Sequence, residues 1–316
     1  MSLKALAIVS HFCSLRRESA RTIAIVMISK RSLLYVGLWH LGLVAGCSAA
    51  PADLDLDRSL VGQASQALTS SETLVAFRTT DGVHYLIAEG DGGGTVTSRA
   101  SAIQAWERFI ISDLDGGSLL SGDRIQIRHV NGTGQSFWVT ADENGGGPGS
   151  ILRANRTLPL EWETFTIWQA GGGVITGGSS VNLQATTRPF YVSAEQGGGQ
   201  AGDGAVTVNR SLALAWETFT LVVITPADLC PFSNSLCLFE RANFDGARFN
   251  VKALDPNAGA CVNLAAHGWG ARARSAVNTN PRSAAVFPNP DCTGHPIGIN
   301  GLEATLPLLP NGAFVF

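Results

Sequence analysis

Residues suited to catalysis are sparse in this sequence. Beyond residue 47 it has four histidines, which are His84, His129, His267 and His295. None lies in a His-Glu-x-x-His helix, and the chain has neither a Gly-x-Ser-x-Gly turn nor a phosphate-binding loop. His84 stands where two similar segments have Phe137 and Phe190, which indicates packing rather than proton transfer. We therefore expect a protein that is not an enzyme and has no metal or cofactor.

Three aromatic residues are the best candidates for ligand binding. Each is followed four positions later by a carboxylate, in the pairs Tyr85 and Glu89, Trp138 and Asp142, and Tyr191 and Glu195. Since neighbours in a strand face opposite sides, these rings point outward if Leu86, Val139 and Val192 point into the core. An aromatic ring flanked by a carboxylate suits a sugar, and three copies would favour a polymer. The alternative is that the rings only cover the flank of the domain.

Four cysteines could form disulfide bonds. Cys230, Cys237, Cys261 and Cys292 all fall in the last 90 residues, and an even local count in an exported protein indicates two disulfides. By spacing alone, three pairings are open.

The N-terminus predicts export. A basic segment begins at Met27, an apolar run spans residues 33–44, and small residues precede Cys47. This pattern is typical of a secretory signal and is too short for a comfortable transmembrane span. The ending Leu43-Val44-Ala45-Gly46-Cys47 resembles the lipobox of bacterial lipoproteins, which implies that Cys47 carries lipid. A plain signal peptide with a coincidental cysteine is the alternative.

The leader and tether precede the folded part. We expect a signal peptide over residues 1–46, with Met27 as an alternative start, and a small, polar, lipidated tether over 47–72. Ser48 after Cys47 suggests the outer membrane or the cell surface. The leader holds six of the 22 basic and one of the 25 acidic residues, so the remainder has a net charge near −8. That charge disfavours nucleic acid as a partner, and we expect a monomer that meets membranes only through its lipid.

From residue 73 to 225 the sequence repeats itself three times. The landmarks are Trp106-Glu107-Arg108-Phe109, Trp162-Glu163-Thr164-Phe165 and Trp216-Glu217-Thr218-Phe219, each preceded by an aromatic strand and a glycine cluster. Short alternating apolar runs between Gly, Asn and Asp turns predict strands. Three units of several strands predict an all-β domain closed as a β-trefoil.

These repeats resemble the fascin-like trefoil family. The shared motif is a strand of the form Tyr-Leu-x-Ala-Glu, a glycine cluster and a later Trp-Glu-Thr-Phe, and it covers residues 74–224. The family resemblance implies the fold. It does not imply actin bundling, because an exported protein does not meet cytoskeletal actin.

Residues 226–316 carry a sequence pattern that differs from the three repeats. Phe239, Phe244 and Gly246 have the aromatic-x4-aromatic-x-Gly spacing of a crystallin Greek key, and Phe287, Cys292 and Gly294 repeat it. The segment thus resembles a βγ-crystallin domain, which implies a two-Greek-key β-sandwich. No calcium-binding signature accompanies these motifs.

The same segment resembles the bacterial crystallin-fold proteinase inhibitors, the group of the Streptomyces metalloproteinase inhibitor. The shared features include Cys230-Pro-x5-Cys237 and Gly246-Ala247-Arg248. This resemblance implies a Cys230–Cys237 bond, and with it Cys261–Cys292. The family's reactive loop is closed by a Cys-x4-Cys disulfide, yet no cysteine stands five residues beyond Cys292.

The sequence is compatible with two functions. The first is a lipid-anchored surface protein whose trefoil binds glycan or another envelope polymer. The second is inhibition of extracellular proteinases by the C-terminal domain, with the trefoil as a support.

Overall fold

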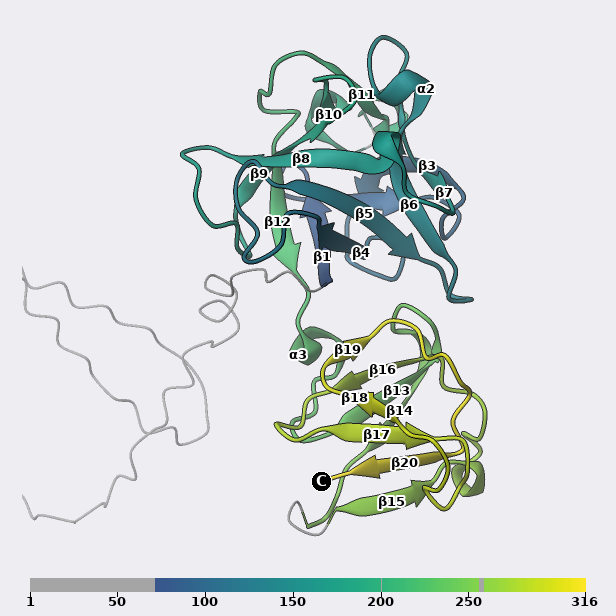
Figure 1. Ribbon diagram of the computed structural model, residues 1–316. Coiled ribbons are helices and arrows are strands. Elements are labelled where there is room, and N and C mark those ends of the chain that lie inside the picture. Colours follow the sequence, from purple (N-terminus) through teal and green to yellow (C-terminus); the bar gives the residue numbers. More distant parts are fainter. Residues whose placement is uncertain (1–71, 200, 256–258) are drawn as a thin grey trace, which may run out of the picture. The chain divides into compact units, whose positions relative to one another are not determined.

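The computed structural model describes residues 72–199, 201–255 and 259–316. The predicted signal peptide, including Met27, and the predicted lipidation site Cys47 lie outside these residues, as does the tether apart from Glu72. The regular secondary structure of the described residues is almost entirely β-strand, so the all-β prediction is confirmed. Strands β1–β12 gather in one body and β13–β20 in another (Figure 1).

The described part of the repeat region contains twelve strands, four for each repeat. The first repeat holds β1 (Thr73–Arg78), β2 (Tyr85–Ala88), β3 (Gly94–Ala100) and β4 (Phe109–Asp113). The second holds β5 (Arg124–Val130), β6 (Ser136–Ala141), β7 (Leu152–Arg156) and β8 (Thr164–Gln169). The third holds β9 (Ser180–Ala185), β10 (Tyr191–Ala194), β11 (Val206–Arg210) and β12 (Phe219–Val223).

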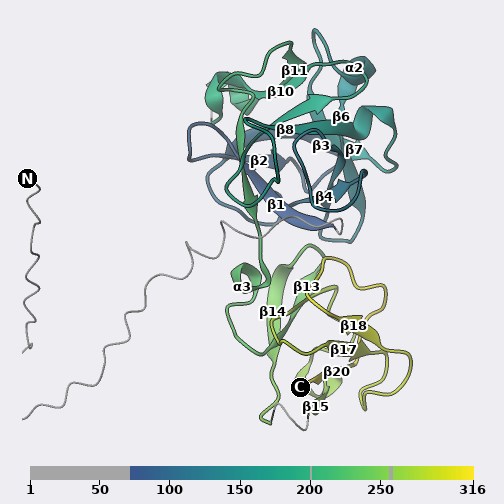
Figure 2. The ribbon, with the colours of Figure 1, turned by 60° about the vertical axis from the view of Figure 1, so that its left-hand side comes forward.

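Six of these strands close a ring. The antiparallel pairs run in the order β1–β4, β4–β5, β5–β8, β8–β9, β9–β12 and β12–β1, so every strand of the ring has two neighbours. The other strands form the hairpins β2–β3, β6–β7 and β10–β11. Closing the ring removes exposed sheet edges. A ring with three hairpins is the arrangement expected of a β-trefoil; Figures 1 and 2 show the strands of this region from two sides.

The core of this region is filled by side chains that alternate along the strands. Leu86, Val139 and Val192 are buried as the strand pattern predicts. The phenylalanines of the three landmarks, Phe109, Phe165 and Phe219, are each at most 1% exposed. The ring of Phe77 contacts those of Phe109 and Phe219 edge to face, with centroids 6.0 and 6.4 Å apart.

The glycine clusters allow the repeats to approach one another. A Cβ on Gly92, whose φ is +87°, would lie 2.5 Å from a ring carbon of Phe137 in the next repeat. Only glycine fits that close approach and that backbone angle. The same relation recurs around the domain, with Phe190 over Gly146 and His84 over Gly199. His84 therefore occupies the structural position of the two phenylalanines.

The C-terminal region is a pair of four-stranded sheets. One has the order β14 (Asp245–Val251), β13 (Leu236–Arg241), β16 (Ser275–Asn278), β19 (Leu302–Glu303). The other has the order β15 (Ala260–Asn263), β20 (Gly312–Val315), β17 (Ala284–Phe287), β18 (Ile297–Ile299). Each run of four consecutive strands sends its third strand into the other sheet, which is a pair of interlocked Greek keys.

Helical turns are short and lie in the connections. They comprise α2 (Asp142–Gly145), α3 (Pro226–Leu229), η1 (Glu161–Glu163), η2 (Glu195–Gly197), η3 (Ala201–Gly204) and η4 (Ala265–His267). Among the described residues no helix is long and apolar enough to cross a membrane.

Candidate functional sites

The predicted aromatic residues lie on the hairpins and are only partly accessible. Tyr85, Trp138 and Tyr191 are half-buried in β2, β6 and β10. The guanidinium carbon of Arg128 lies 5.9 Å from the centroid of the Trp138 ring, so one face of that ring already has a partner. Their neighbours Leu86, Val139 and Val192 enter the core, as the alternation predicts, but Tyr85 also packs against a buried cluster that includes Leu74 and Ala76, and none of the three rings is widely exposed.

The predicted carboxylates are held by arginines of their own hairpins. Glu89 pairs with Arg99 at 2.8 Å, Asp142 with Arg153 at 2.6 Å and Glu195 with Arg210 at 2.7 Å. Each predicted carboxylate is therefore already bound to an arginine in the absence of a ligand.

The sequence interpretation missed a more open aromatic surface. Trp106 and Trp216 are each 41% exposed, and Trp162 is half-buried. Grooves of about 680 and 450 Å³ surround Trp162 and Trp216. Their walls include exposed leucines at equivalent places, Leu158 and Leu160 in one and Leu212 and Leu214 in the other. In the second and third repeats, two leucines stand shortly before the landmark tryptophan. This sequence pattern could have indicated the apolar grooves.

The glutamate of each Trp-Glu-x-Phe landmark is buried and bonds to the turn that precedes the tryptophan. Glu107, Glu163 and Glu217 are at most 4% exposed. Each accepts the backbone N–H three residues earlier, at 2.7 Å from Gln104, 2.7 Å from Leu160 and 2.8 Å from Leu214. The three glutamates thus fix the turn beneath the tryptophan.

The three glutamates differ in their counter-charges. Arg156 lies 3.7 Å from Glu163 and Arg210 lies 3.9 Å from Glu217, whereas the first repeat has Ala100 at the equivalent place. Burial raises the pKa of Glu107, and the hydrogen bond from Gln104 opposes that rise only in part. Ionisation of the Glu107 carboxyl group therefore lowers the stability of the folded protein.

We expect Glu107→Gln to stabilise the protein as the pH rises. Because the folded-state pKa of Glu107 is above its ordinary 4.5, the wild type loses stability as the pH rises through the folded pKa, and the amide variant does not. The gain of the variant should disappear below pH 4.5. Thermal melting across this pH range measures it.

Glu163→Gln is the matched control. This variant keeps an acceptor for the Leu160 N–H but loses its charge interaction with Arg156, so it should lose about 1 kcal/mol at neutral pH. If both variants were less stable than the wild type at neutral pH, the proposed difference between Glu107 and Glu163 would be contradicted.

Two of the histidines each face one carboxylate. His129 is fully buried between the carbonyl of Arg108 and Asp91, at 3.1 Å from each. His84 Nδ1 lies 2.5 Å from Asp81 on the surface of the first repeat. Over residues 72–199, 201–255 and 259–316, no group of three or more His, Cys, Asp or Glu residues could hold a metal ion.

The crystallin-type motifs adopt matching conformations. Phe239 and Phe244 are buried with their rings edge to face, 6.0 Å apart. Phe244 has φ +58°, and Cys292, at the equivalent place after Phe287, has φ +57°. Gly246 and Gly294 follow at φ +80° and +93°. Both motifs therefore fold back at the same corner.

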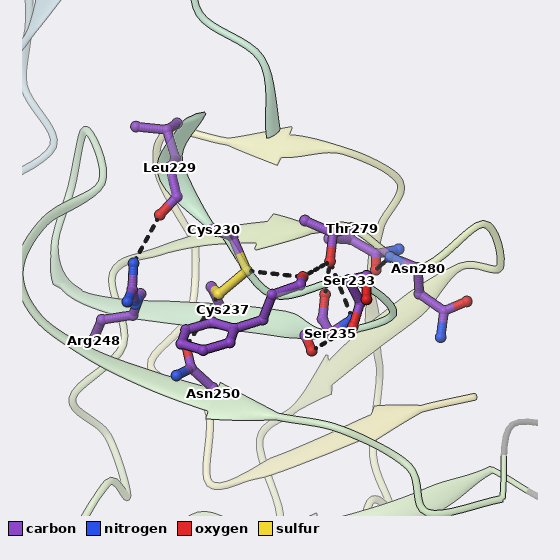
Figure 3. The surroundings of a disulfide bond; sticks show 11 residues. Leu229, Cys230, Ser233, Ser235, Cys237, Arg248, Asn250, Thr279 and Asn280 are labelled. Atoms are coloured by element: carbon purple, nitrogen blue, oxygen red, sulfur yellow. Dashed lines mark hydrogen bonds between the residues drawn. A yellow bond between two sulfur atoms is a disulfide. The ribbon is translucent and has the colours of Figure 1, made fainter. Parts of the chain in front are cut away.

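The structure contains both disulfides that the resemblance implied. Cys230–Cys237 has a Cα–Cα distance of 5.9 Å and joins the end of α3 to β13. Cys261–Cys292 also spans 5.9 Å and joins β15 to the loop after β17. Figure 3 shows the surroundings of Cys230–Cys237, where Thr279 bonds to the segment between the two cysteines and Arg248 bonds to the carbonyl of Leu229 just before Cys230.

The C-terminal region has a match among known protein families. Residues 225–299 match the model of peptidase inhibitor family I36. The matched inhibitor region contains all four cysteines and both crystallin-type motifs. The predicted inhibitor-type domain is confirmed at this level. A search of the curated proteins found no match.

Several solved structures are remotely similar to part of this chain. The SDF2-like protein from Arabidopsis thaliana matches at 13% identity and TM-score 0.40, over 50% of this chain and 95% of that one. A Caenorhabditis elegans protein of unknown function matches at 12% and 0.40, over 50% and 97%. A designed 3-fold symmetric protein, ThreeFoil, matches at 12% and 0.37, over 48% and 99%.

Proposed function

We propose that this protein inhibits an extracellular peptidase through its C-terminal region and catalyses no reaction itself. The match of residues 225–299 to peptidase inhibitor family I36 is the observation that supports it. The two disulfides fit the role, because a cross-linked sandwich resists unfolding in the presence of the enzyme it must block.

The test is direct inhibition by the purified protein. Chymotrypsin, trypsin, subtilisin and thermolysin, which is a metalloproteinase, are each titrated with it, and the initial rate of peptide hydrolysis is measured. We expect a stoichiometric loss of activity for at least one of them. The reduced and alkylated protein is the control. Unchanged rates for all four enzymes at a large molar excess would refute the proposal.

The location of the protein is part of the proposal. The leader and the ending at Cys47 support an exported protein that is held by lipid at the outer membrane or the cell surface and acts as a monomer. Cys47→Ala should shift it from the membrane fraction to the soluble fraction or leave it unprocessed. Unchanged fractionation would count against the lipid anchor.

A second candidate function is binding of glycan or another envelope polymer by the repeat region. The observation that favours it is the pair of equivalent grooves at Trp162 and Trp216. A tryptophan face with apolar neighbours can stack on a sugar ring, and two copies would strengthen binding to a polymer.

Co-sedimentation with insoluble chitin and peptidoglycan tests this second function. Trp162→Ala and Trp216→Ala should each weaken binding, and the double variant should lose most of it. Trp168→Ala is the matched control, since Trp168 is 40% exposed and lies outside the residues that line the grooves. Equal sedimentation of the double variant and the wild type would exclude the grooves.

A further inference from the structure

The repeat region and the C-terminal region lie in one compact unit and share a buried apolar cluster. Leu74 and Ile110, from β1 and β4, are each 5% exposed. Phe239 and Phe244, from the first crystallin-type motif, are 5% and 4% exposed. All four side chains belong to this cluster. Because apolar surface of both regions is removed from water there, the contact stabilises both of them.

The first repeat also bonds to the corner of the first crystallin-type motif. Arg108 Nη1 donates to the carbonyls of Asn243 and of the residue after it, at 2.6 and 3.0 Å. The Asn243 side-chain amide donates to the Ala105 carbonyl at 2.8 Å, and Asn243 is 1% exposed. The Ala242 N–H donates to the Gly132 carbonyl at 3.2 Å. Polar groups on each side thus find partners on the other.

Arg108 stands where the other two repeats have threonine. The hydroxyls of Thr164 and Thr218 each donate to a carbonyl of their own turn, that of Leu160 at 3.0 Å and that of Leu214 at 2.8 Å. An arginine cannot make this short bond. The first repeat therefore exchanges a bond within its own turn for bonds to the C-terminal region.

A second residue of the same turn differs in the same direction. Ile103 packs against the shared apolar cluster, and the equivalent residues of the other repeats are Pro159 and Ala213. The larger apolar side chain adds buried surface to the contact. Two differences between otherwise similar repeats thus serve one contact.

The corners of the two crystallin-type motifs differ in exposure. Asn243 is buried, whereas Asp291, at the equivalent place in the second motif, is exposed. Cys292, which follows Asp291, is fixed by its bond to Cys261. The first corner is therefore covered by the repeat region, and the second is open to solvent.

We propose that the first repeat is a dedicated docking site for the C-terminal region, and that the repeat region stabilises the inhibitor-type fold through it. This role goes beyond the proposed function, because it gives the repeats a task and closes the first crystallin-type corner to a peptidase. Loss of the bonds made by Arg108 or Asn243 should loosen both regions together.

Hydrogen exchange of the purified full chain, followed by mass spectrometry, tests the contact. Arg108→Thr introduces the residue of the other two repeats and removes both bonds from the guanidinium to the corner. Because hydrogen bonds from a charged donor are among the stronger ones, we expect amides in residues 101–108 and 239–246 to exchange about 10- to 100-fold faster. The decisive observation is that segments of both regions change together.

Asn243→Gly tests the same contact from the other side. Asn243 has φ +54°, which glycine adopts without strain, so this variant loses the side-chain amide and keeps the shape of the corner. It should also raise exchange in both segments. Thr164→Ala is the matched control, because the Thr164 hydroxyl donates within its own turn. Its exchange should rise within the second repeat and stay unchanged in residues 239–246.

Two results would overturn the docking role. In the first, Arg108→Thr and Asn243→Gly each speed exchange only in the segment that carries the substitution. In the second, residues 239–246 of the wild type exchange as fast as the exposed residues 293–296. If Arg108→Thr does not fold, Asn243→Gly decides alone. The proposed inhibitory function is measured separately and stands or falls on the peptidase titrations.

Discussion

Replacement of Phe219 by alanine should lower the free energy of unfolding by about 3 to 5 kcal/mol, as for other large aromatic residues in packed cores. Phe219 is fully buried in β12, and its ring contacts that of Phe77 at 6.4 Å. These two residues belong to the last and first strands of the repeat region, which pair to close the ring. The variant therefore loses a core side chain at the place where the first and last strands of the ring pair.

Trp216→Ala, three residues earlier in the same landmark, is the control for Phe219→Ala. Trp216 is 41% exposed and its removal leaves no sealed cavity, so it should cost about 2 kcal/mol, less than the loss of Phe219. Denaturant unfolding of both variants measures the difference. If both variants lost the same free energy of unfolding, the assignment of Phe219 to the core and of Trp216 to the surface would be contradicted.

Replacement of Cys261 and Cys292 by alanine should lower the free energy of unfolding of the C-terminal region by about 2 to 5 kcal/mol. The bond spans 31 residues and connects the two Greek keys, so its loss frees a long segment of the unfolded chain. The Cys230–Cys237 bond is left intact, so the loss reports on Cys261–Cys292 alone.

Mild reduction offers an independent check on the disulfides. Cys261 is exposed, whereas Cys230 and Cys237 are buried, so a low concentration of reductant should open Cys261–Cys292 first. Mass mapping after alkylation reports the order. Preferential opening of Cys230–Cys237, or an unchanged melting temperature in the double alanine variant, would contradict this account.

Much of the architecture was readable from local patterns. Alternation along each strand predicted that Leu86, Val139 and Val192 enter the core, because strand geometry alone decides which neighbours share a face. Recurrence of the Trp-Glu-x-Phe landmark predicted three equivalent units, and the structure places their phenylalanines together in one core.

The candidate sites were less predictable, because they depend on contacts between distant residues. Nothing in the spacing of Glu89, Asp142 and Glu195 shows that arginines of the following strands hold them. Likewise, Thr279 and Arg248 are 47 and 16 positions from Phe232, and only the pairing of β13 with β14 and β16 brings them to it.

The all-β class, the three repeats and the two crystallin-type motifs follow from the sequence, because each depends on strand periodicity or on a motif that is contiguous in the chain. The two cysteine pairs came only from a family resemblance, since spacing leaves three pairings open. Which aromatic residues remain accessible depends on the folded chain: Trp216 and Phe232 are exposed, while Tyr85, Trp138 and Tyr191 are half-buried. Exposure is set by neighbours from other strands, and a linear pattern does not contain those neighbours.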